Sequence, residues 1–161
     1  MAHLTPHYLI GGAFSTESDL APRDAINPCT EDVLWQSPTC GPEHVARAIA
    51  HAKPAHQAWG AVHGWERASI LRAVAAQFTA RADDIAHAMA LEIGRPVAQA
   101  MVEVLAGRDN IICAAGEAER LVGQNIPSRA GGHCRVTPAP VGLVAAFTAL
   151  NFPGNSPLRQ L

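Results

Sequence analysis

The segment from Thr148 to Pro153, T-A-L-N-F-P, carries the side chain best suited to chemistry in this sequence. Asn151 offers two N–H donors on an uncharged side chain, which suits the stabilisation of an oxyanion that develops in a transition state. Asparagine is also a common turn residue ahead of a helix, because its side chain hydrogen-bonds nearby backbone groups. Spacing alone therefore leaves the catalytic and the structural interpretation of Asn151 open.

Histidine and cysteine spacing does not indicate a metal or redox site. His3 and His7 have the i, i+4 spacing that binds a metal on a helix, but Pro6 lies between them and no third ligand follows. The four cysteines form no C-x-x-C pair, which argues against a zinc ribbon and a dithiol motif. Cys29 or Cys134 could be a reactive nucleophile, but neither has a neighbour of evident role. We expect reduced, inert thiols at all four positions, Cys29, Cys40, Cys113 and Cys134.

An almost continuously apolar run, Val141 to Phe147, comes directly before the loop that holds Asn151. Such a run is typical of a parallel strand covered on both faces, and open α/β sheets bind ligands outside the carboxyl ends of such strands. Residues 128–137 are polar and glycine-containing and then alternate, which predicts an exposed or intersubunit strand. Pro138 and Pro140 exclude a central position for that strand.

A block of four helices is predicted between these strands and the N-terminus. The first spans Glu43 to Trp59, interrupted or kinked near Pro54, and the second follows Gly64. The third is capped by Asp83-Asp84 and ends at Gly94, and the fourth starts at Pro96 and continues from Val97 to about Val122. The predicted core-facing stripe of the second helix is Ile70, Leu71, Val74 and Phe78.

Short strands and turns are predicted ahead of the helices. Gly11-Gly12 separates two short apolar stretches and indicates a hairpin. Asn27-Pro28 marks a further turn, and Val33 to Trp35 a short strand after it. The sequence as a whole therefore predicts an α/β fold.

The amino-acid composition limits the classes of partner that we expect for this chain. With 48% hydrophobic residues, 16% charged residues and a net charge of -2, the chain has the balance of an ordinary soluble protein, and a nucleic-acid partner is not indicated. No apolar run approaches the roughly 18 residues that span a bilayer, and the N-terminus lacks a signal-peptide pattern. We therefore expect no membrane partner and a cytoplasmic location.

Short motifs along nearly the whole chain, residues 8 to 161, together resemble the aldehyde dehydrogenase superfamily in order and spacing. Each motif is weak by itself, and the match rests on their succession. They are Tyr8-Leu9-Ile10-Gly11-Gly12, Ile26-Asn27-Pro28-x-Thr30, Trp59 with Trp65-Glu66-Arg67-x-x-Ile70-Leu71, Leu91-Glu92-x-Gly94-Arg95-Pro96, Gly123, Ile126-Pro127-Ser128, Pro140-x-Gly142-Leu143-Val144 and Asn151-Phe152-Pro153.

The resemblance implies NAD(P)-dependent oxidation of an aldehyde to a carboxylic acid, with NAD or NADP as cofactor. In that family a cysteine thiolate attacks the aldehyde, hydride passes to the nicotinamide, and a glutamate-activated water releases the acid. The asparagine of the N-F-P motif donates to the oxyanion, which places Asn151 in that role. Phe147, Thr148, Ala149 and Leu150 are the positions that would touch the cofactor. The common pattern has proline and tryptophan where this chain has Ala149 and Leu150, so a looser contact is implied.

The resemblance also implies that the chain is an N-terminal fragment of the family's Rossmann-type cofactor domain. Residues 1–122 would be the first part of that domain, 123–140 an inserted oligomerisation strand, and 141–161 the first buried strand with the N-F-P loop. The catalytic cysteine, the general-base glutamate and the catalytic domain would lie beyond Leu161, so we expect the fragment alone to be inactive. The complete protein would be a homo-dimer or homo-tetramer.

The substrate is indicated only weakly. The stretch from Asn151 to Leu161 is similar to that of semialdehyde dehydrogenases, which favours a small semialdehyde. The alternative interpretation of the chain is a non-enzymatic helical interaction module or a truncated relic.

Overall fold

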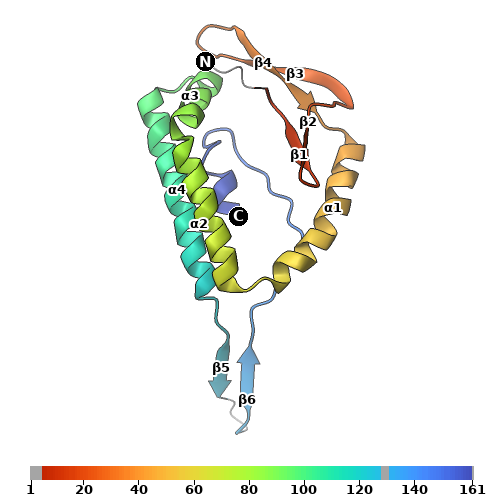
Figure 1. The fold of residues 1–161 in the computed structure, drawn as a ribbon, viewed down its shortest axis with the longest axis vertical. Helices are drawn as coiled ribbons and strands as arrows, with labels where there is room; N and C mark the ends of the chain where they lie inside the picture. Colours follow the sequence, from red (N-terminus) through yellow and green to blue (C-terminus); the bar gives the residue numbers. More distant parts are fainter. Residues whose placement is uncertain (1–4, 128–130, 161) are drawn as a thin grey trace.

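The computed structural model describes residues 5–127 and 131–160, and its elements follow one another in the order strands, helices, strands (Figure 1). Three two-stranded antiparallel sheets form within the described ranges, and each is a hairpin of consecutive strands. The elements are β1 Tyr8–Ile10, β2 Ala13–Ser15, β3 Leu20–Ile26, β4 Val33–Thr39, α1 Pro42–Ala61, α2 Gly64–Ala80, α3 Ala82–Ile93, α4 Val97–Glu119, β5 Gln124–Pro127, β6 His133–Val136 and the short 3-10 helix η1 Pro157–Gln160. The α/β class expected from the sequence is confirmed.

All four predicted helices are present, with small differences at their ends. Pro54 lies inside α1 without interrupting it, because a proline removes only one backbone hydrogen bond and the helix continues on both sides. Gly94 ends α3 in the left-handed conformation, at φ 69°, as predicted. Asp83 and Asp84 occupy the first turn of α3 instead of its cap, and negative charge is favourable there. α4 ends three residues earlier than predicted, at Glu119.

Two clusters of small apolar side chains form the core, and both involve α4. The first joins α2 to α4, and the second joins α3 to α4. Alanines dominate both, so the helix backbones approach closely. The predicted stripe on α2 is correct at Leu71, whereas Ile70 and Val74 are 44% and 37% exposed because Ala68 and Ala75 occupy the contact line. The clusters are Ala68, Leu71, Ala75, Ile111 and Ala115, and Ala82, Ala86, Met89, Ala100 and Val104.

The hairpin of β1 and β2 lies beside α1, whereas the hairpin of β3 and β4 reaches across to the end of α3, where Pro28 and Cys29 lie close to Gly94 (Figure 1). β1 pairs with β2 across Gly11-Gly12, as predicted. β4 begins at Val33 as predicted but continues to Thr39. Its partner β3 was not foreseen, because this strand contains Pro22 and is largely exposed, so it shows no apolar run.

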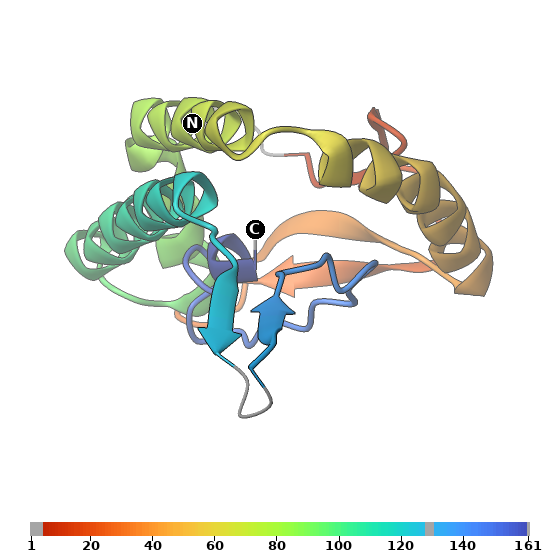
Figure 2. The same cartoon turned by 90° about the horizontal axis from the view of Figure 1, so that it is seen from below.

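The expected strand at 128–137 is the second half of a hairpin. β5 pairs with β6, and all eight paired residues are exposed, while 128–130 lie outside the described residues. The hairpin projects from the body of the molecule in two perpendicular views (Figures 1 and 2). A two-stranded hairpin is marginal on its own in water.

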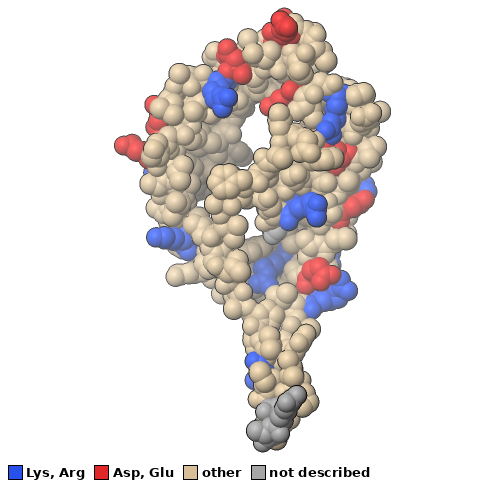
Figure 3. Space-filling model, turned by 180° about the vertical axis from the view of Figure 1, so that it is seen from behind, with Lys and Arg blue, Asp and Glu red and all other residues tan. Residues whose placement is uncertain are grey.

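The prediction of a buried strand from Val141 to Phe147 is wrong for this structure. These residues have no regular secondary structure, and Val141 and Phe147 are 90% and 92% exposed. The physical reason is that a strand needs a neighbour to accept its backbone hydrogen bonds, and the described residues offer it none. On the face seen in Figure 3, openings pass through the middle of the molecule, so this part of the chain is not packed into a continuous core. The described helices include none that is long and apolar enough to cross a membrane.

A buried histidine links both N-terminal hairpins to α1. His44 is 3% exposed, and its Nδ1 contacts a carboxylate oxygen of Asp19, while its Nε2 lies 2.7 Å from the hydroxyl of Tyr8. The same oxygen of Asp19 accepts the N–H of Gly41 at 3.2 Å. The hydrogen bond with His44 is the main reason that the pKa of Asp19 lies below its ordinary value of 3.8.

This lowered pKa predicts a pH-dependent loss of stability in the Asp19→Asn variant. A carboxylate with a lowered folded pKa contributes stability above its unfolded pKa, and the contribution disappears as the pH falls through the folded value. We therefore expect Asp19→Asn to unfold more easily than the parent at pH 7, with the difference shrinking below pH 3.8. Urea titrations of the chain across pH 2 to 7 would measure it. Asp24→Asn is the matched control, since Asp24 contacts only Gln36 on the exposed hairpin. Equal sensitivity of both variants would contradict this assignment.

Candidate functional site

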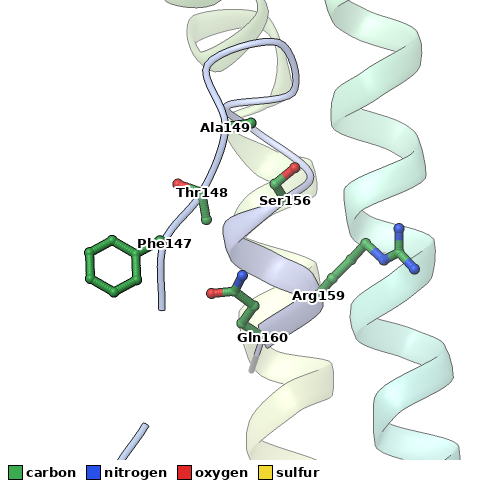
Figure 4. Close-up of a pocket in the computed structure, with 6 residues that line it drawn as sticks. All are labelled: Phe147, Thr148, Ala149, Ser156, Arg159 and Gln160. Carbon is green, nitrogen blue, oxygen red and sulfur yellow. The ribbon is translucent and has the colours of Figure 1, made fainter. Parts of the chain in front are cut away.

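The loop predicted as the site borders an open cavity at the C-terminal end of the described chain. Phe147, Thr148 and Ala149 line a cavity of about 220 Å³ together with three residues of the following turn, Ser156, Arg159 and Gln160 (Figure 4). Figure 4 shows the Phe147 ring on one side and the Arg159 guanidinium turned outwards on the other. Leu150 does not line the cavity and is 69% exposed. The structure thus brings three of the four predicted cofactor contacts to one surface.

The chemistry of this lining suits an anionic ligand. Thr148 and Ser156 supply hydroxyl groups, Gln160 a carboxamide and Arg159 a permanent positive charge. No carboxylate and no cysteine lies among the six lining residues. Within the described ranges no group of three histidine, cysteine or acidic residues could hold a metal ion, and all four cysteines are exposed. The lining therefore offers donors for phosphate or carboxylate oxygens and no thiol nucleophile.

Asn151 lies in the turn that follows the cavity-lining residues. The residue is exposed, and its carboxamide makes no hydrogen bond with the described part of the chain. The turn-capping interpretation of its side chain therefore has no support in this structure. Its backbone carbonyl is engaged, because Nη2 of Arg95 donates to it at 2.5 Å. Among the described residues, therefore, only the backbone of Asn151 is held, and its side-chain donors have no partner there.

Two charged residues hold the loop against the helices, and sequence reasoning missed both. Glu103 lies on α4 with a side chain that is 3% exposed, and its Oε1 accepts the backbone N–H groups of Gly154 at 2.8 Å and Asn155 at 3.0 Å. Its Oε2 accepts a charge-assisted hydrogen bond from Arg95. A third contact joins the side chains of Asn110 and Asn155 at 2.6 Å. The Asn151 to Asn155 segment is thus tied to α4 and to Arg95 in the connection between α3 and α4.

A signal for Glu103 was present in the sequence. The buried face of α4 consists of small or aliphatic residues and one acid, since it contains Ala100, Glu103, Val104, Gly107, Ile111 and Ala115. A lone carboxylate in an apolar stripe has to find buried donors, because an unpaired buried charge is costly. The pattern indicates that Glu103 has partners. It does not say that they lie 51 and 52 residues further along the chain.

An apolar contact completes the attachment of this segment. Leu158 of η1 packs against the cluster formed by α2 and α4. The short helix η1 accordingly lies beside α4 (Figure 2). The segment from Asn151 to Gln160 therefore sits on the helical block, whereas the chain before it passes close to α1, where Pro140 lies near Gly60.

Comparisons with known proteins agree on one family. The model of the aldehyde dehydrogenase family matches residues 14–161. Succinate-semialdehyde dehydrogenase [NADP(+)] of Escherichia coli is 35% identical over 146 residues, which are 90% of this chain and 30% of that protein. An aldehyde dehydrogenase structure from Brucella melitensis biovar abortus superposes with a TM-score of 0.93 at 34% identity and covers 99% of this chain and 33% of its own. Succinate-semialdehyde dehydrogenase from Burkholderia pseudomallei gives 0.90 at 32% identity, covering 98% and 33%.

Proposed function

The chain belongs to the aldehyde dehydrogenase family, and on this premise we propose that it serves in the oxidation of an aldehyde to a carboxylic acid with NAD or NADP. It spans about a third of the length of the relatives it matches. The proposal therefore concerns the full-length protein that contains this chain. The chain contributes an oxyanion donor, a surface for the cofactor and a projecting hairpin, and the thiol nucleophile comes from outside its described part.

The observation that carries the proposal is the arrangement around Asn151. Its carboxamide is exposed and available, while its backbone carbonyl and the following residues are fixed by Arg95 and Glu103. Donors that are held in place before the reaction stabilise a developing oxyanion without the cost of reorganisation. We assign this role to Asn151. As an amide it donates without exchanging a proton, so the role does not depend on pH.

The cofactor surface in this proposal consists of Phe147, Thr148, Ala149 and Leu150. The adjoining turn adds the hydroxyl of Ser156 and the carboxamide of Gln160, whose donors fit a phosphate-bearing nucleotide. When bound, the nicotinamide accepts hydride from the substrate. The chain's own residues bind and orient the cofactor, with Ala149 and Leu150 giving a looser contact.

We place the oligomer contact in the β5–β6 hairpin. All eight of its paired residues are exposed, and Ile126 and Val136 are 44% and 48% accessible. A hairpin of this size needs a partner to remain ordered in water. Pairing with a second copy of the protein would supply it, and this supports a homo-dimer or homo-tetramer.

A semialdehyde is the substrate class that we propose. Such a molecule carries a carboxylate at the end opposite the aldehyde, and Arg159 offers a guanidinium that has no acidic partner among residues 5–127 and 131–160. The Arg159 side chain extends from η1 to the side opposite Phe147 (Figure 4). The 35% identical relative from Escherichia coli is named for succinic semialdehyde, which supports this choice.

The decisive experiment compares two aldehydes of equal length, succinic semialdehyde and butanal, with NAD and with NADP. We expect the full-length protein to reduce one of the cofactors and to prefer the acid-bearing aldehyde. Arg159→Gln should raise the KM for succinic semialdehyde about ten- to hundredfold, since a charge-assisted hydrogen bond contributes roughly 1.5 to 3 kcal/mol, and should leave the KM for butanal unchanged. Arg120→Gln is the matched control, because Arg120 pairs only locally with Glu117 and Gly116.

The possible results distinguish the proposed aldehyde oxidation from the proposed preference for a semialdehyde. One outcome is that the parent enzyme oxidises butanal and that Arg159→Gln changes the KM for neither aldehyde. This outcome would contradict the semialdehyde assignment but would still support aldehyde oxidation. Absence of turnover with every aldehyde and both cofactors would favour the non-enzymatic interaction module. The 161-residue chain alone should show no turnover, because it supplies donors and no placed nucleophile.

A further inference from the structure

Glu103 uses both carboxylate oxygens to hold the segment that carries Asn151. Oε1 accepts two successive backbone N–H groups, those of Gly154 and Asn155, and Oε2 accepts from Arg95. The side chain is 3% exposed, so it has exchanged water for these donors. A buried carboxylate is stable only where donors of this kind satisfy it. The burial of Glu103 and the conformation of the loop therefore depend on each other.

Arg95 connects this carboxylate to Asn151 itself. One arm of its guanidinium binds Glu103, and the other donates to the backbone carbonyl of Asn151 at 2.5 Å. The guanidinium carbon also lies 5.6 Å from the centre of the Phe152 ring, within cation–π range. Arg95 is placed by the chain reversal at Gly94 and by Pro96, which begins the approach to α4. The fork reaches two partners because a guanidinium is planar and has several fixed donors.

We propose that Arg95 and Glu103 are positioning residues that set the carboxamide of Asn151 for oxyanion binding. The inference rests on the role of Asn151 proposed above. It adds that Arg95 and Glu103 connect the turn of Asn151 to the helical block and so fix the position of its carboxamide. Arg95 fixes the carbonyl of Asn151, and Glu103 fixes the chain three and four residues later. A displacement of about 1 Å in a catalytic group can cost about a hundredfold in rate, so the anchor should be visible in kcat.

The first variant is Glu103→Gln in the full-length enzyme. Glutamine keeps the size and one carbonyl acceptor, but it presents an NH₂ group where Glu103 accepts, so one of the three donors faces another donor. We expect kcat to fall about tenfold with little change in KM, because binding of the aldehyde does not need the oxyanion contact. Arg95→Lys, which keeps the charge but loses the fork, should behave alike.

The matched control breaks another carboxylate–guanidinium pair that holds helices together. Glu119 accepts two hydrogen bonds from Arg72, at 2.7 and 2.8 Å, and joins α4 to α2 away from the loop. Glu119→Gln should leave kcat unchanged. If Glu103 had only a structural role, Glu103→Gln and Glu119→Gln would both lower the amount of folded enzyme and leave kcat per folded molecule unchanged. That result would contradict the positioning role.

A double-mutant cycle decides whether the two residues act through Asn151. In an Asn151→Ala background, Glu103→Gln and Arg95→Lys should lower kcat no further, since the group that they position is gone. Losses that multiply independently would overturn the positioning role and leave the role of Asn151 intact. An unchanged kcat in Asn151→Ala alone would overturn the oxyanion role and the positioning role with it. Should Glu103→Gln fail to fold, the cycle with Arg95→Lys gives the same decision.

Discussion

Asn151→Ala is expected to lower kcat of the full-length enzyme by about 10²- to 10³-fold, with the KM for the aldehyde and the affinity for the cofactor nearly unchanged. The reason lies in the geometry of the turn. The carboxamide of Asn151 is exposed and makes no hydrogen bond to the described residues, so its loss breaks no contact within that part of the chain. The backbone anchors of the turn, Arg95 and Glu103, are retained in this variant.

Steady-state kinetics of the variant and two companions would measure the effect. Asn151→Asp keeps the shape but replaces the N–H donors with a negative charge, so it should be at least as impaired as Asn151→Ala. Gln57→Ala removes a carboxamide from an exposed position of α1 and should leave kcat at the parent value. A loss of less than about tenfold in Asn151→Ala would contradict the oxyanion role, because a single donor of that kind is usually worth more.

Gly64→Ala should destabilise the helical block by about 1 to 3 kcal/mol, the usual cost of overpacking. Gly64 is the first residue of α2 and faces the end of α4. A methyl group there would overlap the carbonyl oxygen of Ala118 and lie 3.3 Å from its carbonyl carbon. Both are backbone atoms, which cannot rotate away as the tip of a side chain can. The two helices would have to separate at this end.

Gly116→Ala is the matched control for this prediction, and it has the opposite sign. Gly116 lies inside α4, and a methyl group there would meet nothing within 4 Å. The variant should gain up to about 1 kcal/mol, since alanine is the better helix former. Urea titrations followed by circular dichroism at 222 nm would give both values for the chain. A Gly64→Ala midpoint at or above that of the parent would contradict the close approach of the two helices.

The parts of the fold that could be predicted are those decided by near neighbours in the sequence. The helical repeat, the Gly11-Gly12 hairpin and the stop at Gly94 depend on residues within a few positions, and all three are confirmed. The strand at Val141 to Phe147 was wrong because its existence depends on a partner strand. β3 was missed because its pairing with β4 tolerates Pro22 and an exposed face.

The candidate site was predictable only in part for a similar reason. The residue types of the loop marked Asn151 directly, and its role stays a prediction. The anchors Arg95 and Glu103 were not foreseen, because their contacts join positions 51 to 56 residues apart. No periodic pattern reports such a distance. A buried acid on an otherwise apolar helix face was the one local sign, and it predicts that a partner exists without naming it.

The two alanine-rich clusters also indicate the order in which parts of the chain fold. α2, α3 and α4 are consecutive along the chain and are joined by connections of one and three residues, Arg81 and Gly94 to Pro96. Contacts between consecutive elements form quickly, because little chain entropy is lost in closing the loops. During synthesis these helices leave the ribosome before residues 141 to 160 do. The three helices can therefore fold and pack first. The segment that carries Asn151 then docks onto a helical surface that is already folded.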